Sequence, residues 1–193
     1  MSTRCYIAKQ IGEDLYRAIC CHFNGYIEHC GAVLLDTYDT PEKVNELLSL
    51  GDIKCLGPKL YPAPDQPHGV DCRQEDVTTA YARDLGEEKI EAEVMTLGQL
   101  DHPAGEIEYV YIFTRSEQWK FFECGCLEAG LRDVRETLDE VYSQFGLTRP
   151  EGYFGMLTNR AIEQLRKEQG LAGTAFQSQE AECQSATQTM QTL

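Results

Sequence analysis

Two imidazoles, a carboxylate, a carboxamide and a phenol gather near the N-terminus, in the segment 22–31, HFNGYIEHCG. Histidine titrates near neutral pH, so His22 can act as a general base or bind a phosphate. Asn24-Gly25 predicts a turn, and the backbone N–H groups that begin the following helix attract anions. The candidate ligand-binding residues of this segment are His22, Asn24, Tyr26, Glu28 and His29. The alternative interpretation is that the turn and the histidines serve only the fold.

A second polar cluster, AYARDLGE, spans residues 80–87. We expect a strand over 77–83 with Tyr81 and Arg83 on one face, and a turn after it. Arg83 can clamp a carboxylate or phosphate through two hydrogen bonds. The alternative is a surface ion pair with a neighbouring acid, which adds little stability. If the two clusters meet, they form one pocket, in which the catalytic candidates are His22, Arg83 and Asp84 and the added ligand-binding residues are Tyr81, Arg83 and Glu87.

Nine cysteines do not fall into a metal-binding pattern, because no C-x2-C spacing occurs. We therefore predict no metal, no cofactor and free thiols packed as small apolar groups. Three groupings leave a zinc site open if they converge: Cys20-Cys21-His22, His29-Cys30 and Cys124-Gly125-Cys126. A Cys21 nucleophile beside His22 is a further alternative, although neighbours in a strand point to opposite faces.

The chain is acidic, with 17 Lys and Arg against 32 Asp and Glu, and a formal charge of -15. This balance argues against neutralising nucleic-acid phosphates and against docking to an anionic membrane. Carboxylates on a folded surface can instead imitate phosphates and occupy a nucleic-acid channel of another protein. The candidate partner-binding residues are Glu87, Glu88, Glu91 and Glu93. The alternative is that the charge serves only solubility.

The elements that must position these residues follow from periodicity. Two β-hairpins are expected, at 3–22 and 108–122, and a strand with one exposed face at 90–94. A helix cap at Thr40-Pro41 begins a helix that Gly51 is placed to end. Further helices are expected at 26–38, 127–145 and 158–170, and an exposed loop at 57–76.

These elements predict an α+β protein: a mostly antiparallel sheet of about five or six strands with helices on one face, plus a C-terminal helical appendage. The expected divisions are an α+β domain at 1–125, the appendage at 126–172 and a disordered tail at 173–193. Charged residues interrupt the N-terminus and no apolar run approaches a membrane span, which favours a cytoplasmic protein.

The two polar clusters resemble a family of small proteins carried by bacterial phages, plasmids and integrative elements. The family patterns are H-[WF]-D-G-Y-x-x-H-x-G and A-Y-x-R-D-R-G-E, and the resemblance covers roughly residues 1–123. This chain departs from them at Asn24, Cys30 and Leu85. The resemblance implies a setting in mobile elements, where small acidic proteins often antagonise host defence.

Two main functions follow. The first is an acidic binding protein that inhibits a CRISPR effector or restriction nuclease by covering its basic nucleic-acid-binding surface. The second is a small enzyme, or a sequestering protein, acting on a phosphate-bearing ligand in a pocket of His22 and Arg83. A structural accessory protein of the mobile element is a third alternative. The sequence leaves the partner and the oligomeric state open.

Overall fold

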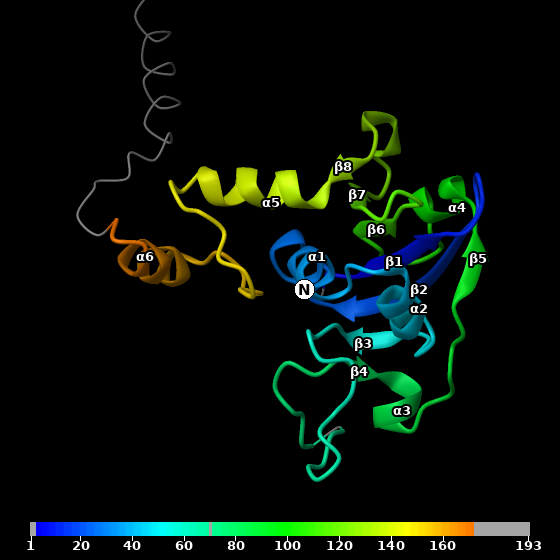
Figure 1. The fold of residues 1–193 in the computed structure, drawn as a ribbon. Coiled ribbons are helices and arrows are strands. Elements are labelled where there is room, and N and C mark those ends of the chain that lie inside the picture. Colours follow the sequence, from blue (N-terminus) through cyan, green and yellow to red (C-terminus); the bar gives the residue numbers. More distant parts are fainter. Residues whose placement is uncertain (1–2, 70, 172–193) are drawn as a thin grey trace, which may run out of the picture.

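The computed structural model describes residues 3–69 and 71–171, built around one mixed sheet of eight strands (Figure 1). The strands are β1 (Cys5–Gln10), β2 (Tyr16–Phe23), β3 (Ile53–Cys55), β4 (Thr79–Ala80), β5 (Glu93–Met95), β6 (Tyr109–Phe113), β7 (Trp119–Glu123) and β8 (Arg132–Asp133). Their order is β4-β3-β2-β1-β6-β7-β8, with β5 also paired to β2.

The helical elements are η1 (Ile27–Gly31, a π-helix), α1 (Ala32–Thr37), α2 (Pro41–Leu48), α3 (Tyr81–Leu85), α4 (Leu97–Asp101), η2 (Leu127–Ala129, a 3-10 helix), α5 (Val134–Ser143) and α6 (Asn159–Glu168). The Thr40 cap is confirmed, since its side chain accepts a hydrogen bond from the N–H of Lys43. Among the described residues, no helix is long and apolar enough to span a membrane.

The α+β class and both hairpins are confirmed, but the sheet is larger and less antiparallel than the sequence predicts. The pairs β1–β2 and β6–β7 are antiparallel hairpins. The pairs β2–β3 and β1–β6 are parallel. Short strands such as β3 and β4 leave little periodic signal, and the parallel pairs join segments that are far apart in the sequence.

Helices cover both faces of the sheet, which corrects the expectation of helices on one face. Alternation along each strand divides the apolar side chains between the faces. One face packs against α1, α2 and α5 and holds the largest core cluster, which includes Ile7, Ile19 and Tyr111. The other face holds Ala8, Val110 and Leu100, the last from α4. Away from α4, this second face carries the polar residues of the candidate site.

The segment 77–83 is not the continuous strand that its β-forming residues predict. Only Thr79 and Ala80 pair with β3, and the chain then turns into α3. The Asp84 carboxylate accepts a hydrogen bond from the N–H of Ala80, which stabilises this turn at its start. Gly86, with φ of +68°, ends the helix.

The C-terminal part is partly built into the sheet. Residues 127–133, expected to be helical, form η2 and β8, and α5 begins only at Val134 because Asp133 caps it. Val134 and Leu138 of α5 join the main core. The helix α6 lies beyond the end of α5 (Figure 1) and contributes Leu165 to a small separate cluster. The expected disordered tail lies outside the described residues.

Candidate functional site

Three side chains with metal-binding atoms converge on the second face of the sheet. Cys20 and His22 are two residues apart on β2, so they lie on the same face. Asp52 reaches them from the residue that precedes β3. Each offers one ligand atom, and these atoms lie within 4.8 Å of one another. Thiolate sulfur, imidazole nitrogen and carboxylate oxygen are the ligand types that zinc takes in proteins.

Asp52 is held by backbone hydrogen bonds on both sides. Its Oδ1 accepts a 2.8 Å bond from the N–H of Cys20, and its own N–H donates 2.9 Å to the carbonyl of Ile90. Gly51, with φ of +72°, allows the second bond, because a Cβ there would lie 2.2 Å from the Ile90 oxygen. The carboxylate is therefore fixed between β2 and the segment 86–92 that leads into β5.

Tyr81 orients the imidazole. Its hydroxyl lies 2.9 Å from Nδ1 of His22, and the two rings meet edge to face with centroids 5.0 Å apart. If Nδ1 donates to the phenol oxygen, the ring presents a lone pair at Nε2. A metal-binding histidine usually donates its other ring N–H to a group that fixes the tautomer in this way.

The pKa values of Cys20 and Asp52 are both raised, chiefly by burial. Burial raises the pKa of the Cys20 thiol to about 12, and the Asp52 carboxylate adds to the rise. Burial also raises the pKa of Asp52, although the Cys20 N–H and His22 oppose it. Cys20 without a cation is thus a protonated thiol rather than an activated nucleophile. A bound cation would relieve the charge repulsion between Cys20 and Asp52.

A cavity of about 80 Å³ opens beside two of the three residues, Cys20 and Asp52. Its lining combines Cys20 and Asp52 with Tyr6 and with two exposed acids, Glu91 and Glu93. A drug-sized ligand needs roughly 300–1,000 Å³, so this space suits an ion and a water rather than a nucleotide. The acidic lining also repels anions.

Arg83 and Asp84 belong to a separate network that holds the loop 57–76. All three guanidinium nitrogens donate within the protein: to Asp84, to the carbonyl of Leu60 and to the carbonyl of Thr78. Asp84 is only 3% exposed and lies 3.6 Å from the ring of the buried His68. Binding an anion at Arg83 would require breaking these bonds, so the structure gives the pair a role in the fold.

The other residues predicted from the first cluster also stabilise the chain. His29 places Nδ1 2.7 Å from the carbonyl of Phe154 and Nε2 3.0 Å from the carbonyl of Leu56, joining η1 to two distant segments. Asn24 has φ of +59° and forms the expected turn. Tyr26 and Glu28 are half-buried at the start of η1.

The predicted partner-binding acids lie on the chain between α3 and the end of β5. Their members, all exposed, are Glu87, Glu88, Glu91 and Glu93. Glu91 pairs with Lys89 at 2.9 Å, and Glu87 raises the pKa of Tyr81, adding to the effect of burial. The segment thus forms an acidic border along the Cys20, His22 and Asp52 site.

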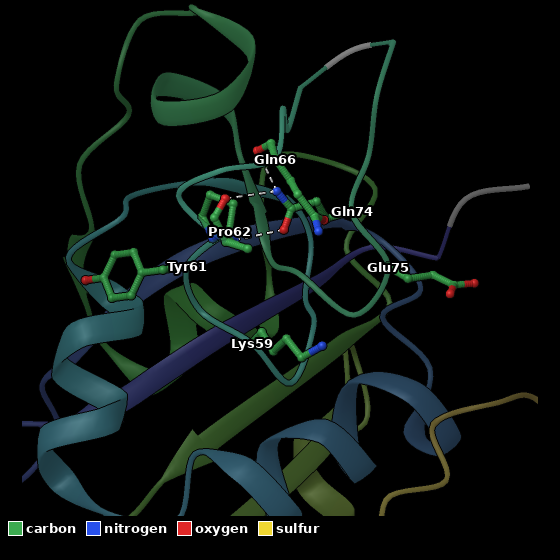
Figure 2. Close-up of a pocket in the computed structure, with 7 residues that line it drawn as sticks. Lys59, Tyr61, Pro62, Gln66, Gln74 and Glu75 are labelled. Carbon is green, nitrogen blue, oxygen red and sulfur yellow. Dashed lines mark hydrogen bonds between the residues drawn. The ribbon is translucent and has the colours of Figure 1, made fainter.

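The loop 57–76 bears a depression of about 490 Å³ (Figure 2). Gln74 lines the depression. Its side chain donates a 2.8 Å hydrogen bond to the carbonyl of Gln66 and accepts a 2.9 Å bond from the N–H of Ala63. Figure 2 shows Glu75 pointing away from these residues. The depression therefore uses its polar groups to hold the loop.

The sequence places His22 and Tyr81 together only as candidate residues of one hypothetical pocket. It does not single out Asp52 as a candidate site residue. Asp52 comes directly after the helix and the glycine, Gly51, that is placed to end it, and this position ordinarily predicts a loop. The usable signal was the Cys20-x-His22 spacing, which places two ligands on one strand face.

A comparison of the chain with family models, curated proteins and solved structures gives no match.

Proposed function

We propose that this protein binds a zinc ion through Cys20, His22 and Asp52. The observation that carries the proposal is the convergence of sulfur, nitrogen and oxygen ligand atoms within 4.8 Å. Tetrahedral zinc holds its ligands roughly 3.3–3.8 Å apart, so small side-chain rotations are enough to close the site. Three protein ligands leave a fourth position for water or a substrate atom, which is the arrangement of catalytic zinc sites.

The same features favour a cation over the phosphate-bearing ligand that the two polar clusters suggest. The cavity holds about 80 Å³ and is lined by Asp52, Glu91 and Glu93. Arg83, the expected anion clamp, is occupied by Asp84 and backbone carbonyls. The acidic lining of the cavity would therefore repel a phosphate, and the Arg83 guanidinium already donates its hydrogen bonds within the protein.

The test is a competitive titration of zinc against a chromophoric chelator, with the full reduced chain. We expect one tight equivalent in the wild type and its loss in Cys20→Ala and Asp52→Asn. The matched controls are Cys126→Ala, which removes an exposed thiol, and Asp65→Asn, which removes an exposed carboxylate. Retention of the tight equivalent in Cys20→Ala and Asp52→Asn would overturn the proposal.

A second function, the inhibition of a defence nuclease by phosphate imitation, is favoured by the exposed acids of the segment 87–93. The four glutamates lie on one stretch of chain, and the other three are all within four residues of Glu91. The resemblance to mobile-element proteins supports the same class of partner: a host protein with a basic nucleic-acid-binding surface. Such a complex would form quickly and weaken with salt.

Cleavage assays with CRISPR effectors and restriction nucleases test this second function. We expect inhibition by the wild type that fades as salt rises, and its loss on changing all four segment glutamates to glutamine. A charge-matched control changes four exposed acids elsewhere, Glu136, Asp139, Glu140 and Glu151. Equal loss in both variants would mean that total charge, rather than this segment, is responsible.

A further inference from the structure

Two thiols outside the proposed zinc site stand one residue apart, where the chain leaves β7. Cys124 is half-buried and Cys126 is exposed. Residues 123–126 form a β-turn, closed by a 2.9 Å hydrogen bond from the N–H of Cys126 to the carbonyl of Glu123. Gly125 has φ of +78°, the conformation that a type II turn requires at its third residue. Residues two apart in such a turn have Cα atoms roughly 5–6 Å apart, a separation that a disulfide spans.

The turn is anchored on one side and open on the other. The buried carboxylate of Asp101, at the end of α4, accepts a 2.7 Å hydrogen bond from the N–H of Gly125. The sulfur of Cys124 lies 3.7 Å from the carbonyl of Leu100, and its side chain packs against the second core cluster. Turning this side chain toward Cys126 costs the weak hydrogen bond of its thiol to Leu100. Cys126 itself is open to solvent.

The surroundings of this pair suit sulfur exchange rather than metal binding. Within the described residues, the group of three metal-binding side chains is Cys20, His22 and Asp52. No third ligand atom therefore stands beside Cys124 and Cys126. Exposed disulfides are the labile ones, which open and close by exchange with other thiols and disulfides. A disulfide that includes Cys126 would belong to this class.

We propose that Cys124 and Cys126 form a redox-active dithiol, which closes to a disulfide by exchange with a small disulfide of the glutathione class. Cys126 gives its proton to solvent, and its thiolate attacks the small disulfide and releases one small thiolate, which takes up a proton. Cys124 then loses its proton and attacks the Cys126 sulfur of the mixed disulfide, which releases the second small thiol. One small disulfide is reduced to two thiols, and the two cysteines are oxidised by the loss of two hydrogens.

The different surroundings of the two thiols set their order of reaction. Burial raises the pKa of Cys124 to about 11, and Asp101 and Cys126 add to the rise. The Cys124 thiol is therefore protonated at neutral pH, which leaves the exposed Cys126 as the first nucleophile. The second step occurs within one chain, at an effective thiol concentration of about millimolar or more. Closure should therefore follow quickly once the mixed disulfide has formed.

The experiment treats the full reduced chain with oxidised glutathione and maps the tryptic peptide 121–132, which contains both cysteines. We expect this peptide to become two hydrogens lighter, with two glutathione thiols released for each link. Cys124→Ser should lose the link and keep one glutathione on Cys126. The matched control is Cys72→Ser, which removes an exposed thiol elsewhere and should form the link as the wild type does.

A second variant and a folding check keep the result interpretable. Cys126→Ser changes an exposed side chain, and it should lose the link while Cys124 stays unmodified. Far-UV circular dichroism checks both variants, and Cys124→Ala replaces Cys124→Ser if the serine disturbs the fold. Three results would overturn the proposal: glutathione that stays on Cys126 in the wild type as it does in Cys124→Ser, a link from Cys126 to another cysteine, or no reaction at Cys126.

Discussion

Alternation along β2 gives adjacent cysteines different chemistry. Cys20 lines a small acidic cavity and shares its face of the sheet with His22, whereas Cys21 points into the apolar core. A shift of one residue along the strand thus separates a candidate zinc ligand, Cys20, from a buried core residue, Cys21. The side-chain period of two makes this division unavoidable in a strand that is covered on only one side at this point.

The affinity of the proposed site for zinc should rise with pH. Burial raises the pKa of Cys20 to about 12, so the thiol is protonated throughout the neutral range and zinc must displace its proton. We expect the apparent affinity to rise about tenfold per pH unit between about pH 7 and 8. Chelator competition measures this slope. An affinity independent of pH in that range would exclude Cys20 as a ligand.

Tyr81→Phe should weaken zinc binding without removing it. The phenol oxygen lies 2.9 Å from His22 Nδ1 and orients the ring, and outer groups of this kind are typically worth about 10–100-fold in metal affinity. The control is Tyr61→Phe, which removes a phenol that bonds to Glu46 on the surface. Equal affinity of Tyr81→Phe and the wild type would contradict the orienting role.

At the scale of elements, the site depends on how the segment 86–92 is tied to β3. Gly51→Ala should destabilise the protein by at least about 2 kcal/mol, because φ is +72° and the new Cβ meets the Ile90 carbonyl. It should also weaken zinc binding, since Asp52 follows directly. Gly98→Ala, a change in α4 with open space around it, should instead be neutral or stabilising by up to about 1 kcal/mol. Denaturant unfolding compares the two variants.

The C-terminal connector is fastened to α1 by a bidentate ion pair. Both guanidinium nitrogens of Arg149 donate 2.8 Å bonds to Asp36, and the two side chains are 7% and 9% exposed. Burial pulls the pKa of Asp36 upward, but the bonds from Arg149 and the Gly152 N–H outweigh it and lower the pKa below its ordinary 3.8. Because the folded pKa is depressed, this stabilisation is present above the ordinary value and is lost as pH falls through the folded one.

Arg149→Ala should therefore lower the free energy of unfolding by about 3 kcal/mol at neutral pH, since it leaves a buried carboxylate unpaired. The difference from wild type should shrink as pH falls below about 4, because Asp36 takes up a proton first in the unfolded chain and, at lower pH, in the folded pair. Arg132→Ala breaks an exposed pair with Glu123 and should change stability by less than about 1 kcal/mol. A penalty for Arg149→Ala that is the same at pH 7 and pH 3 would contradict this account.

Local patterns predicted the elements that strong periodicity or caps define. Both hairpins and the helix after Thr40 follow from such signals. The signal failed over 77–83: the Asp84 carboxylate accepts a hydrogen bond from the N–H of Ala80, and residues 81–85 form a helix despite their β-forming neighbours. The candidate site could not be predicted for a different reason: the parallel pairing of β2 with β3, two segments far apart in the sequence, brings Asp52 to Cys20.

At the scale of the whole molecule, the exposed acidic segment, which carries part of the net charge of -15, adjoins the proposed zinc site. Glu91 and Glu93 line the cavity beside Asp52 and also belong to the exposed acidic segment. A partner that covers the segment would therefore also cover the metal. The two proposed functions are distinguishable, because Cys20→Ala removes the metal and leaves the acidic surface unchanged.

The proposed zinc ion is held by one sulfur together with nitrogen and oxygen ligands. The most direct test is the zinc K-edge X-ray absorption spectrum of the full chain loaded with one equivalent of zinc. We expect one sulfur neighbour at about 2.3 Å and the remaining ligands as nitrogen or oxygen at about 2.0–2.2 Å. A shell of three or four sulfurs, or a shell with none, would contradict it.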